Sequence, residues 1–177
     1  RGVVTASSGN HAQAVAAACA SLGIDAAVYA PVNCNPAKLA GMRKYGATVH
    51  LVGTVSSERE AAAEELAAKE GRLLVHPFAD PAVRAGQGTI GLEIIADLPE
   101  LDAVIAPVGG GGLISGVAAA IKALKPGARV FGAEPLSAAR YGRSRAAGRP
   151  VALDKSEIDT LADGTRNDRA DAGNFEL

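Results

Sequence analysis

Short apolar segments alternate with helix-like segments along most of this chain. Repeated β–α units joined by short turns predict parallel sheets whose strands are connected by helical crossovers. The strand-like segments are residues 3–5, 26–30, 48–52, 72–75, 103–108 and 129–133. The helix-like segments are residues 11–22, 36–45, 57–70, 82–96 and 113–124. The alternation therefore predicts an α/β fold built from doubly wound parallel sheets.

The β–α pattern changes near residue 76, where a connecting segment carries Pro77 and Pro81. We expect two domains, a small α/β domain at 1–77 and part of a larger α/β domain at 78–177. The helix of the second domain at 82–96 is expected to be interrupted by its glycines at 86 and 88. Beyond about residue 137 the sequence is polar and irregular, and it predicts no regular element there.

The two ends of the sequence look cut. It begins at Arg1 without an initiator methionine, runs directly into a strand, and stops at Leu177 in mid-pattern. We therefore expect both sheets to belong to a chain that is truncated at both ends.

The composition of the chain argues against several classes of binding partner. The 177 residues carry a net charge of −1 with no basic stripe, which argues against nucleic acid. No apolar run is long enough to span a membrane. The two cysteines are too few for a disulfide framework or a metal cluster, and nothing suggests secretion. A cytoplasmic protein that acts on a small molecule is expected.

Four consecutive glycines occupy residues 109–112, between a strand-like and a helix-like segment. One or two glycines would satisfy a tight turn, whereas four indicate close approach of a ligand to the backbone. Backbone N–H groups at a helix N-terminus converge on anions, and the helix dipole favours negative charge there. The turn therefore predicts a phosphate site.

A dinucleotide site is the alternative interpretation of the same turn. Gly110, Gly112 and Gly116 roughly imitate a Rossmann turn, and Glu134 ends the next strand where a ribose-binding acid would lie. This reading predicts a nicotinamide-dependent oxidoreductase, although the spacing departs from G-x-G-x-x-G.

A second strand-to-helix turn, residues 7–11, is filled with small hydrogen-bonding groups and is called the Ser-Gly-Asn turn below. A helix N-cap explains one such residue, but five in succession exceed what a cap needs. Ligands of open parallel sheets bind beyond the carboxyl ends of strands, where this turn lies. A binding role is therefore predicted.

Three segments together, residues 5–13, 85–89 and 107–113, closely resemble the pyridoxal-phosphate enzymes of fold type II, which have the tryptophan synthase β-like fold. The best match is the serine/threonine dehydratase and serine racemase family, and the resemblance covers essentially the whole chain. Cysteine synthases share the Ser-Gly-Asn turn but have a threonine-containing phosphate loop.

The resemblance implies a lyase of amino-acid metabolism that binds pyridoxal 5'-phosphate. Such a dehydratase, or ammonia-lyase, converts L-serine, L-threonine or a similar 3-hydroxy amino acid to a 2-oxo acid and ammonia. Serine racemase is the alternative. The resemblance also implies that 78–177 is part of the large cofactor-binding domain and that the full-length protein is a homo-oligomer.

Roles of single residues follow from the same resemblance. Asn10 is expected to hydrogen-bond the 3-hydroxyl of the cofactor ring, and Gly164 to lie beside the cofactor. The expected ligands of the cofactor phosphate are the backbone amides of Gly109, Gly110, Gly111 and Gly112. The substrate carboxylate is expected to bind Ser7, Gly9 and His11, together with Asn10.

Ser8 distinguishes the two activities that the resemblance implies. In the racemases this position is a serine that acts as acid and base on the face opposite the cofactor lysine, whereas many dedicated dehydratases carry alanine there. Serine in this chain keeps racemisation open.

Glu134 has a third interpretation as a metal ligand. In part of the family the equivalent glutamate, a carbonyl four residues on and an aspartate two residues further bind a divalent cation. Here those positions are Ala138 and Arg140, and arginine would repel a cation. We therefore expect no metal site but an ion pair between Glu134 and Arg140.

The lysine that carries the cofactor as a Schiff base is expected upstream of the Ser-Gly-Asn turn. None of the lysines in this sequence matches that motif: Lys38, Lys44, Lys69, Lys122, Lys125 and Lys155. The chain is therefore expected to be inactive alone.

Overall fold

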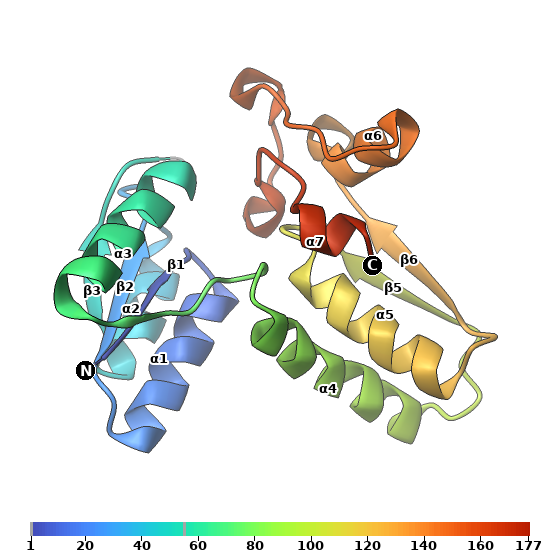
Figure 1. The fold of residues 1–177 in the computed structure, drawn as a ribbon, viewed down its shortest axis with the longest axis horizontal. Coiled ribbons are helices and arrows are strands. Elements are labelled where there is room, and N and C mark those ends of the chain that lie inside the picture. The colour runs from blue at the N-terminus through green and yellow to red at the C-terminus, as the bar shows by residue number, and fades with distance from the viewer. Residues whose placement is uncertain (1, 55) are drawn as a thin grey trace. The chain divides into compact units, whose positions relative to one another are not determined.

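The computed structural model describes residues 2–54 and 56–177, so Arg1, where the first domain is expected to begin, and Val55 lie outside the described residues. The chain divides into two compact units, the first ending at Pro77 and the second beginning at Phe78 (Figure 1). Each unit has its own sheet. Within the described residues no helix is both long enough and apolar enough to cross a membrane.

The first unit contains a four-stranded sheet in the order β3-β2-β1-β4, and every pair of neighbouring strands is parallel. Its strands are β1 (Val3–Ala6), β2 (Ala26–Ala30), β3 (Thr48–Leu51) and the short β4 (Leu73–Leu74). Its helices are α1 (Asn10–Leu22), α2 (Pro36–Lys44) and α3 (Ser56–Glu70).

Helices cover both faces of this sheet. Successive residues of a strand point to opposite faces, so neighbouring residues of β1 contact different helices. Val3 packs with Ala16 and Met42, which lie on α1 and α2. Val4, the next residue, packs instead with Ala63 of α3. The prediction of a doubly wound parallel sheet is confirmed for this unit.

The strand order places β1 at the point where the chain changes direction across the sheet. β2 and β3 follow on one side of β1, whereas β4 returns to its other side. Crevices at the carboxyl ends of strands beside such a reversal are the usual ligand sites of open α/β sheets. The Ser-Gly-Asn turn follows β1 directly and therefore lies at this point.

The second unit contains two parallel strands, β5 (Ala103–Pro107) and β6 (Arg129–Ala133). Its longer helices are α4 (Pro81–Asp97) and α5 (Gly112–Leu124). The shorter ones are α6 (Arg140–Ala147), α7 (Ala172–Phe175) and the 3-10 turns η1 (Leu136–Ala138), η2 (Lys155–Glu157) and η3 (Asp163–Thr165).

Helices α4 and α5 both pack on one face of this second sheet, through a cluster that includes Val104 and Val130. On the opposite face Ile105 and Phe131 are 72% and 46% exposed. The parallel pairing agrees with the expected α/β fold, whereas the doubly wound arrangement stays a prediction for this unit, since its described part covers only one face of the two strands.

Helix α4 is continuous, so its expected interruption at residues 86–88 is wrong. The glycines let α4 approach α5 closely: a Cβ on Gly88 would lie 3.3 Å from the carbonyl oxygen of Gly116. A Cβ on Gly91 would lie 2.8 Å from the Cβ of Ala120. Tertiary packing against α5 therefore outweighs the low helix propensity of glycine.

Helix α6 lies in the region expected to be irregular. Its buried positions are Arg140 and Ser144, one turn apart, rather than apolar residues. A helix whose inward face is polar shows no hydrophobic period, and this is why the sequence pattern missed it.

Candidate functional site

The glycine turn joins β5 to α5, and neighbouring groups occupy the places where its side chains would lie. A Cβ on Gly109 would lie 2.8 Å from the carbonyl oxygen of Gly164, and one on Gly110 would overlap the ring of Phe78. A Cβ on Gly112 would lie 2.9 Å from the Cα of Phe78. The structure thus brings Gly164 beside the turn, and it adds Phe78, which the sequence reasoning missed.

The carbonyl groups at the start of the turn, those of Val108, Gly109 and Gly110, accept hydrogen bonds from side chains elsewhere in the second unit. Arg140 Nη2 donates to the carbonyl oxygens of Val108 and Gly109. The carbonyl oxygen of Gly110 accepts from Tyr141 Oη at 2.9 Å and from Asn174 Nδ2 at 2.8 Å. These anchors fix the orientation of three successive peptide planes.

The backbone amide groups of the turn, unlike these carbonyls, have no hydrogen-bond partner in the described part of the chain. Among the described residues, none of the backbone N–H groups of residues 109–113 donates a hydrogen bond. The described peptide bonds are all trans, so each anchored carbonyl directs the N–H of the following residue the other way. The turn therefore presents donors at the N-terminus of α5 with its acceptors already used, as an anion requires.

Asn174 and Tyr141 form the support behind the turn. Asn174 is buried; its amide nitrogen also donates to the carbonyl oxygen of Phe78 at 3.0 Å, and its Oδ1 accepts from Arg84 Nη1 at 3.1 Å. Tyr141 Oη accepts from the amide of Asp171 at 3.2 Å. Burial raises the pKa of Tyr141. Sequence reasoning missed both residues because they lie where no periodic pattern is present.

The Ser-Gly-Asn turn begins where β1 ends. The amide of Ser7 donates to the carbonyl oxygen of Tyr29, and the amide of Gly9 donates to Ser7 Oγ at 3.3 Å. Gly9 is the N-cap of α1, and no side chain caps this helix. Within the described residues the side chains of Ser8 and Asn10 make no hydrogen bond. Both therefore have their full hydrogen-bonding capacity for a ligand.

His11 lies differently from Asn10. Its Nε2 is 3.0 Å from Thr5 Oγ1 and 3.3 Å from the carbonyl oxygen of Val75. Thr5 is fully buried and donates to the same carbonyl at 2.7 Å. His11 thus ties the first turn of α1 to β1 and to the residue after β4. Its expected role at the substrate carboxylate stays a prediction.

The carboxylate of Glu134 is occupied by the N-terminus of α6. Its two oxygens accept from the amides of Tyr141 at 3.1 Å and Gly142 at 2.9 Å. Arg140 Nη1 lies 3.8 Å from Oε1, so the expected ion pair forms. Among the described residues no group of three or more His, Cys, Asp or Glu side chains is arranged to hold a metal.

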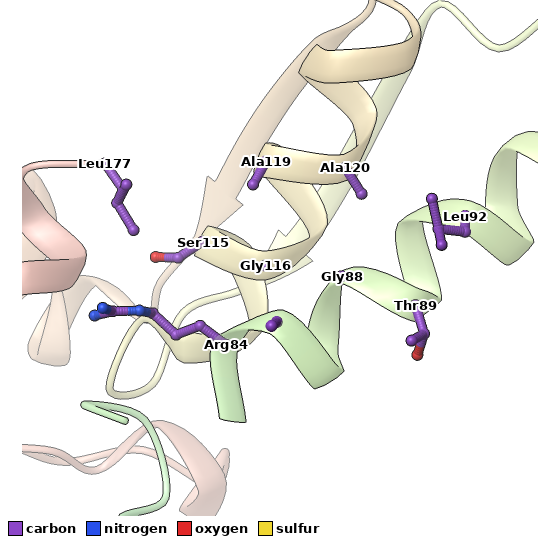
Figure 2. A pocket seen from close by; sticks show the side chains of 10 residues that line it. Arg84, Gly88, Thr89, Leu92, Ser115, Gly116, Ala119, Ala120 and Leu177 are labelled. Carbon is purple, nitrogen blue, oxygen red and sulfur yellow. The ribbon is translucent and has the colours of Figure 1, made fainter. Parts of the chain in front are cut away.

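A hollow of about 310 Å³ runs along α4 and α5 in the second unit (Figure 2). The side chains of Arg84, Ser115 and Leu177 gather at one end of it. The 85–89 segment lines this hollow through Ala85, Gly88 and Thr89, whereas the glycine turn does not contribute to it. Residues 85–89 therefore border this hollow, whereas the glycine turn at residues 109–112 lies outside its lining.

Comparison with known proteins adds to this geometry. The family model described as "Pyridoxal-phosphate dependent enzyme" matches residues 1–177. The chain belongs to this family. The pyridoxal-phosphate dependent enzymes that it resembles include both activities expected from the sequence, and solved structures of them share its fold.

An L-threonine ammonia-lyase of Geobacter sulfurreducens is 44% identical over 93% of this chain and 40% of its own length. A serine racemase of Oryza sativa subsp. indica is 42% identical over 94% of this chain and 48% of its own. The processed form of threonine deaminase isoform 2 from Solanum lycopersicum superposes with a TM-score of 0.89 at 42% identity, covering 98% of this chain and 50% of that one. The chain spans about half the length of the curated relatives it matches.

Proposed function

We propose that this chain supplies the phosphate-binding and substrate-binding turns of a pyridoxal-phosphate dependent dehydratase of 3-hydroxy amino acids. The observation that carries the proposal is the one-sided glycine turn, whose carbonyls are anchored and whose amides have no acceptor in the described residues. Free donors at the N-terminus of α5 fit the phosphate of the cofactor, whose charge the helix dipole favours.

The Ser-Gly-Asn turn fits the other groups that such a reaction presents. Asn10 has an unused side-chain amide, which can hydrogen-bond the 3-hydroxyl of the cofactor ring. The first turn of α1 can hold the substrate carboxylate through backbone amides and Ser7. Pyridoxal phosphate, when bound, withdraws electrons from the substrate α-carbon, which makes its proton and β-hydroxyl easier to remove.

The substrate class comes from the relatives. Their names include L-threonine ammonia-lyase, L-threonine dehydratase and serine racemase. We infer that the full-length protein acts on L-threonine, L-serine or a close 3-hydroxy relative, and that it releases a 2-oxo acid and ammonia. None of the lysines in this sequence fits the family motif, so we propose that this chain contributes binding rather than the cofactor lysine.

Serine racemase is a second candidate because of Ser8. Its hydroxyl lies in the turn after β1 and has no hydrogen-bond partner among the described residues. A free hydroxyl near the substrate α-carbon could deliver a proton from the face opposite the lysine. Racemase relatives match this chain about as well as the ammonia-lyases. The nicotinamide alternative has less support, because the Glu134 carboxylate is used at the N-terminus of α6.

The test uses the full-length protein loaded with pyridoxal phosphate and supplied with L-threonine or L-serine. We expect a 2-oxo acid and ammonia from both, with D-serine appearing only if Ser8 acts as an acid. Ser8→Ala should then abolish D-serine and spare 2-oxo acid formation. Ser21→Ala is the matched control, since that hydroxyl is exposed and bonds only within α1. Failure of the loaded protein to form either product would contradict the proposal.

A further inference from the structure

Arg140 is fully buried, which is uncommon for a guanidinium. Its Nη1 donates to the carbonyl oxygens of Ala138 at 2.8 Å and Thr165 at 3.0 Å. Its Nη2 donates to the carbonyl oxygens of Val108, at 2.9 Å, and Gly109. Five oxygens from four segments of the second unit therefore surround one cation, the fifth being the Glu134 carboxylate at 3.8 Å.

The burial of this charge needs a reason, because desolvation of an ion is unfavourable unless partners replace the water. Burial lowers the pKa of Arg140, and the neighbouring Glu134 acts in the opposite direction. Its Nε has no hydrogen-bond partner among the described residues, so the site does not satisfy the side chain completely. Carbonyl and carboxylate oxygens of this kind are the ligands that hard cations take. Here the cation is part of the chain.

The contacts of Arg140 determine the direction of two amide groups. The carbonyls of Val108 and Gly109 point toward the guanidinium, so the N–H groups of Gly109 and Gly110 point away from it across trans peptides. The Gly110 carbonyl is held separately, by Tyr141 and Asn174. Arg140 thus acts on the first half of the turn alone.

We propose that Arg140 is a positioning residue that orients the Gly109 and Gly110 amides toward the cofactor phosphate, and that it fills an oxygen cage that would otherwise take a free cation. The inference rests on the proposed function, since it assigns the phosphate to this turn. It adds a residue that never touches the anion and yet sets the affinity of the turn for it.

The test measures the binding of pyridoxal phosphate and of inorganic phosphate to the full-length apoprotein. Arg140→Ala should weaken both by at least about tenfold, less than the roughly 10²–10³-fold lost in rate when an oxyanion-hole donor is removed, because here the amides are misdirected rather than removed. Guanidinium ion at concentrations far below denaturing levels should restore most of the loss, because the cage then receives its cation. Arg143→Ala is the matched control: Arg143 lies on the same helix, exposed and paired with Glu157.

Wild-type affinity in Arg140→Ala, or a loss that guanidinium does not reduce, overturns the inference. If Arg140→Ala does not fold, Arg140→Lys decides: an ammonium cannot span both sets of carbonyls, so a partial loss is expected and unchanged affinity overturns the inference. If the wild-type protein binds neither probe, the proposed function is wrong. The positioning role is then judged from the amide NMR shifts of Gly109 and Gly110, which must change in Arg140→Lys but not in Arg143→Ala.

Discussion

The four glycines at residues 109–112 lack side chains for different reasons. Gly109 faces the carbonyl of Gly164, and Gly110 and Gly112 face Phe78. Gly111 alone has a left-handed backbone, with φ of 92°. The run therefore reflects close packing behind the turn, and at Gly111 it also reflects the left-handed backbone.

Gly111→Ala should destabilise the second unit. Alanine is strained at positive φ, and its Cβ would overlap Tyr141 Oη and approach the Cβ of Asn174 to 2.9 Å. We expect a loss of about 1–3 kcal/mol in the free energy of unfolding, measured in urea. Gly127→Ala is the control, because nothing lies within 4 Å of its Cβ position and its φ is not positive. Equal effects of the two substitutions would argue against the packing described here.

Tyr141 is expected to make the free energy of unfolding decrease at alkaline pH. Burial raises the pKa of its phenol in the folded state, so the folded protein holds this proton more tightly than the unfolded chain. Its contribution is complete below the unfolded pKa of about 10 and is lost as pH rises through the folded value. In urea unfolding between about pH 8 and pH 11, the wild type should lose more stability than Tyr141→Phe. Parallel pH curves for the two proteins would contradict this expectation.

At the scale of elements, the contact between α4 and α5 depends on glycine on both helices. A Cβ on Gly116 would overlap the carbonyl oxygen of Arg84 and lie 2.8 Å from the amide nitrogen of Gly88. These are backbone atoms, which cannot move without shifting a whole helix. The two helices form the covered side of the second sheet, so their spacing also sets where the N-terminus of α5 lies.

Gly116→Ala should therefore lower the free energy of unfolding by about 1–3 kcal/mol or more. Gly86→Ala tests the same change inside α4 at a position with nothing within 4 Å, and it should stabilise by up to about 1 kcal/mol through helix propensity. Thermal and urea unfolding of both variants measure the difference. A stabilising effect of Gly116→Ala would show that the helices are further apart than the structure has them.

At the scale of the whole molecule, each unit carries one turn that the sequence had singled out. Residues 7–11 follow β1 at the reversal of strand order in the first sheet, and residues 109–112 follow β5 in the second. Each unit also has its own core, so ligand binding at one turn is expected to stabilise first the unit that carries it.

Pyridoxal phosphate should stabilise the second unit, because it binds the folded state and not the unfolded chain. At a concentration about 100 times the dissociation constant, the free energy of unfolding should rise by about 2.7 kcal/mol. Hydrogen exchange of the amides at residues 109–113 should slow, because they then have an acceptor. Pyridoxal, which lacks the phosphate, is the control and should protect these amides far less. Equal protection by both compounds would place the phosphate elsewhere.

Much of the architecture could be predicted because it follows local rules. β1 and β2 are short apolar segments between turn residues, and the cap and proline at Asn35 and Pro36 mark the start of α2. Helix α6 could not be predicted, since its buried residues are polar. Neither could the continuity of α4, because its glycines make sense only against α5.

The sequence by itself determined the α/β alternation, the position of both turns and the family, because hydrophobic period, glycine runs and short motifs are local properties of the chain. Only the tertiary structure decided which atoms of the glycine turn are free. Residues 108–110 are held by Arg140, Tyr141 and Asn174, which lie about 30 to 60 residues further along the chain. A carbonyl's partner depends on which segments pack behind it, and no local pattern records that packing.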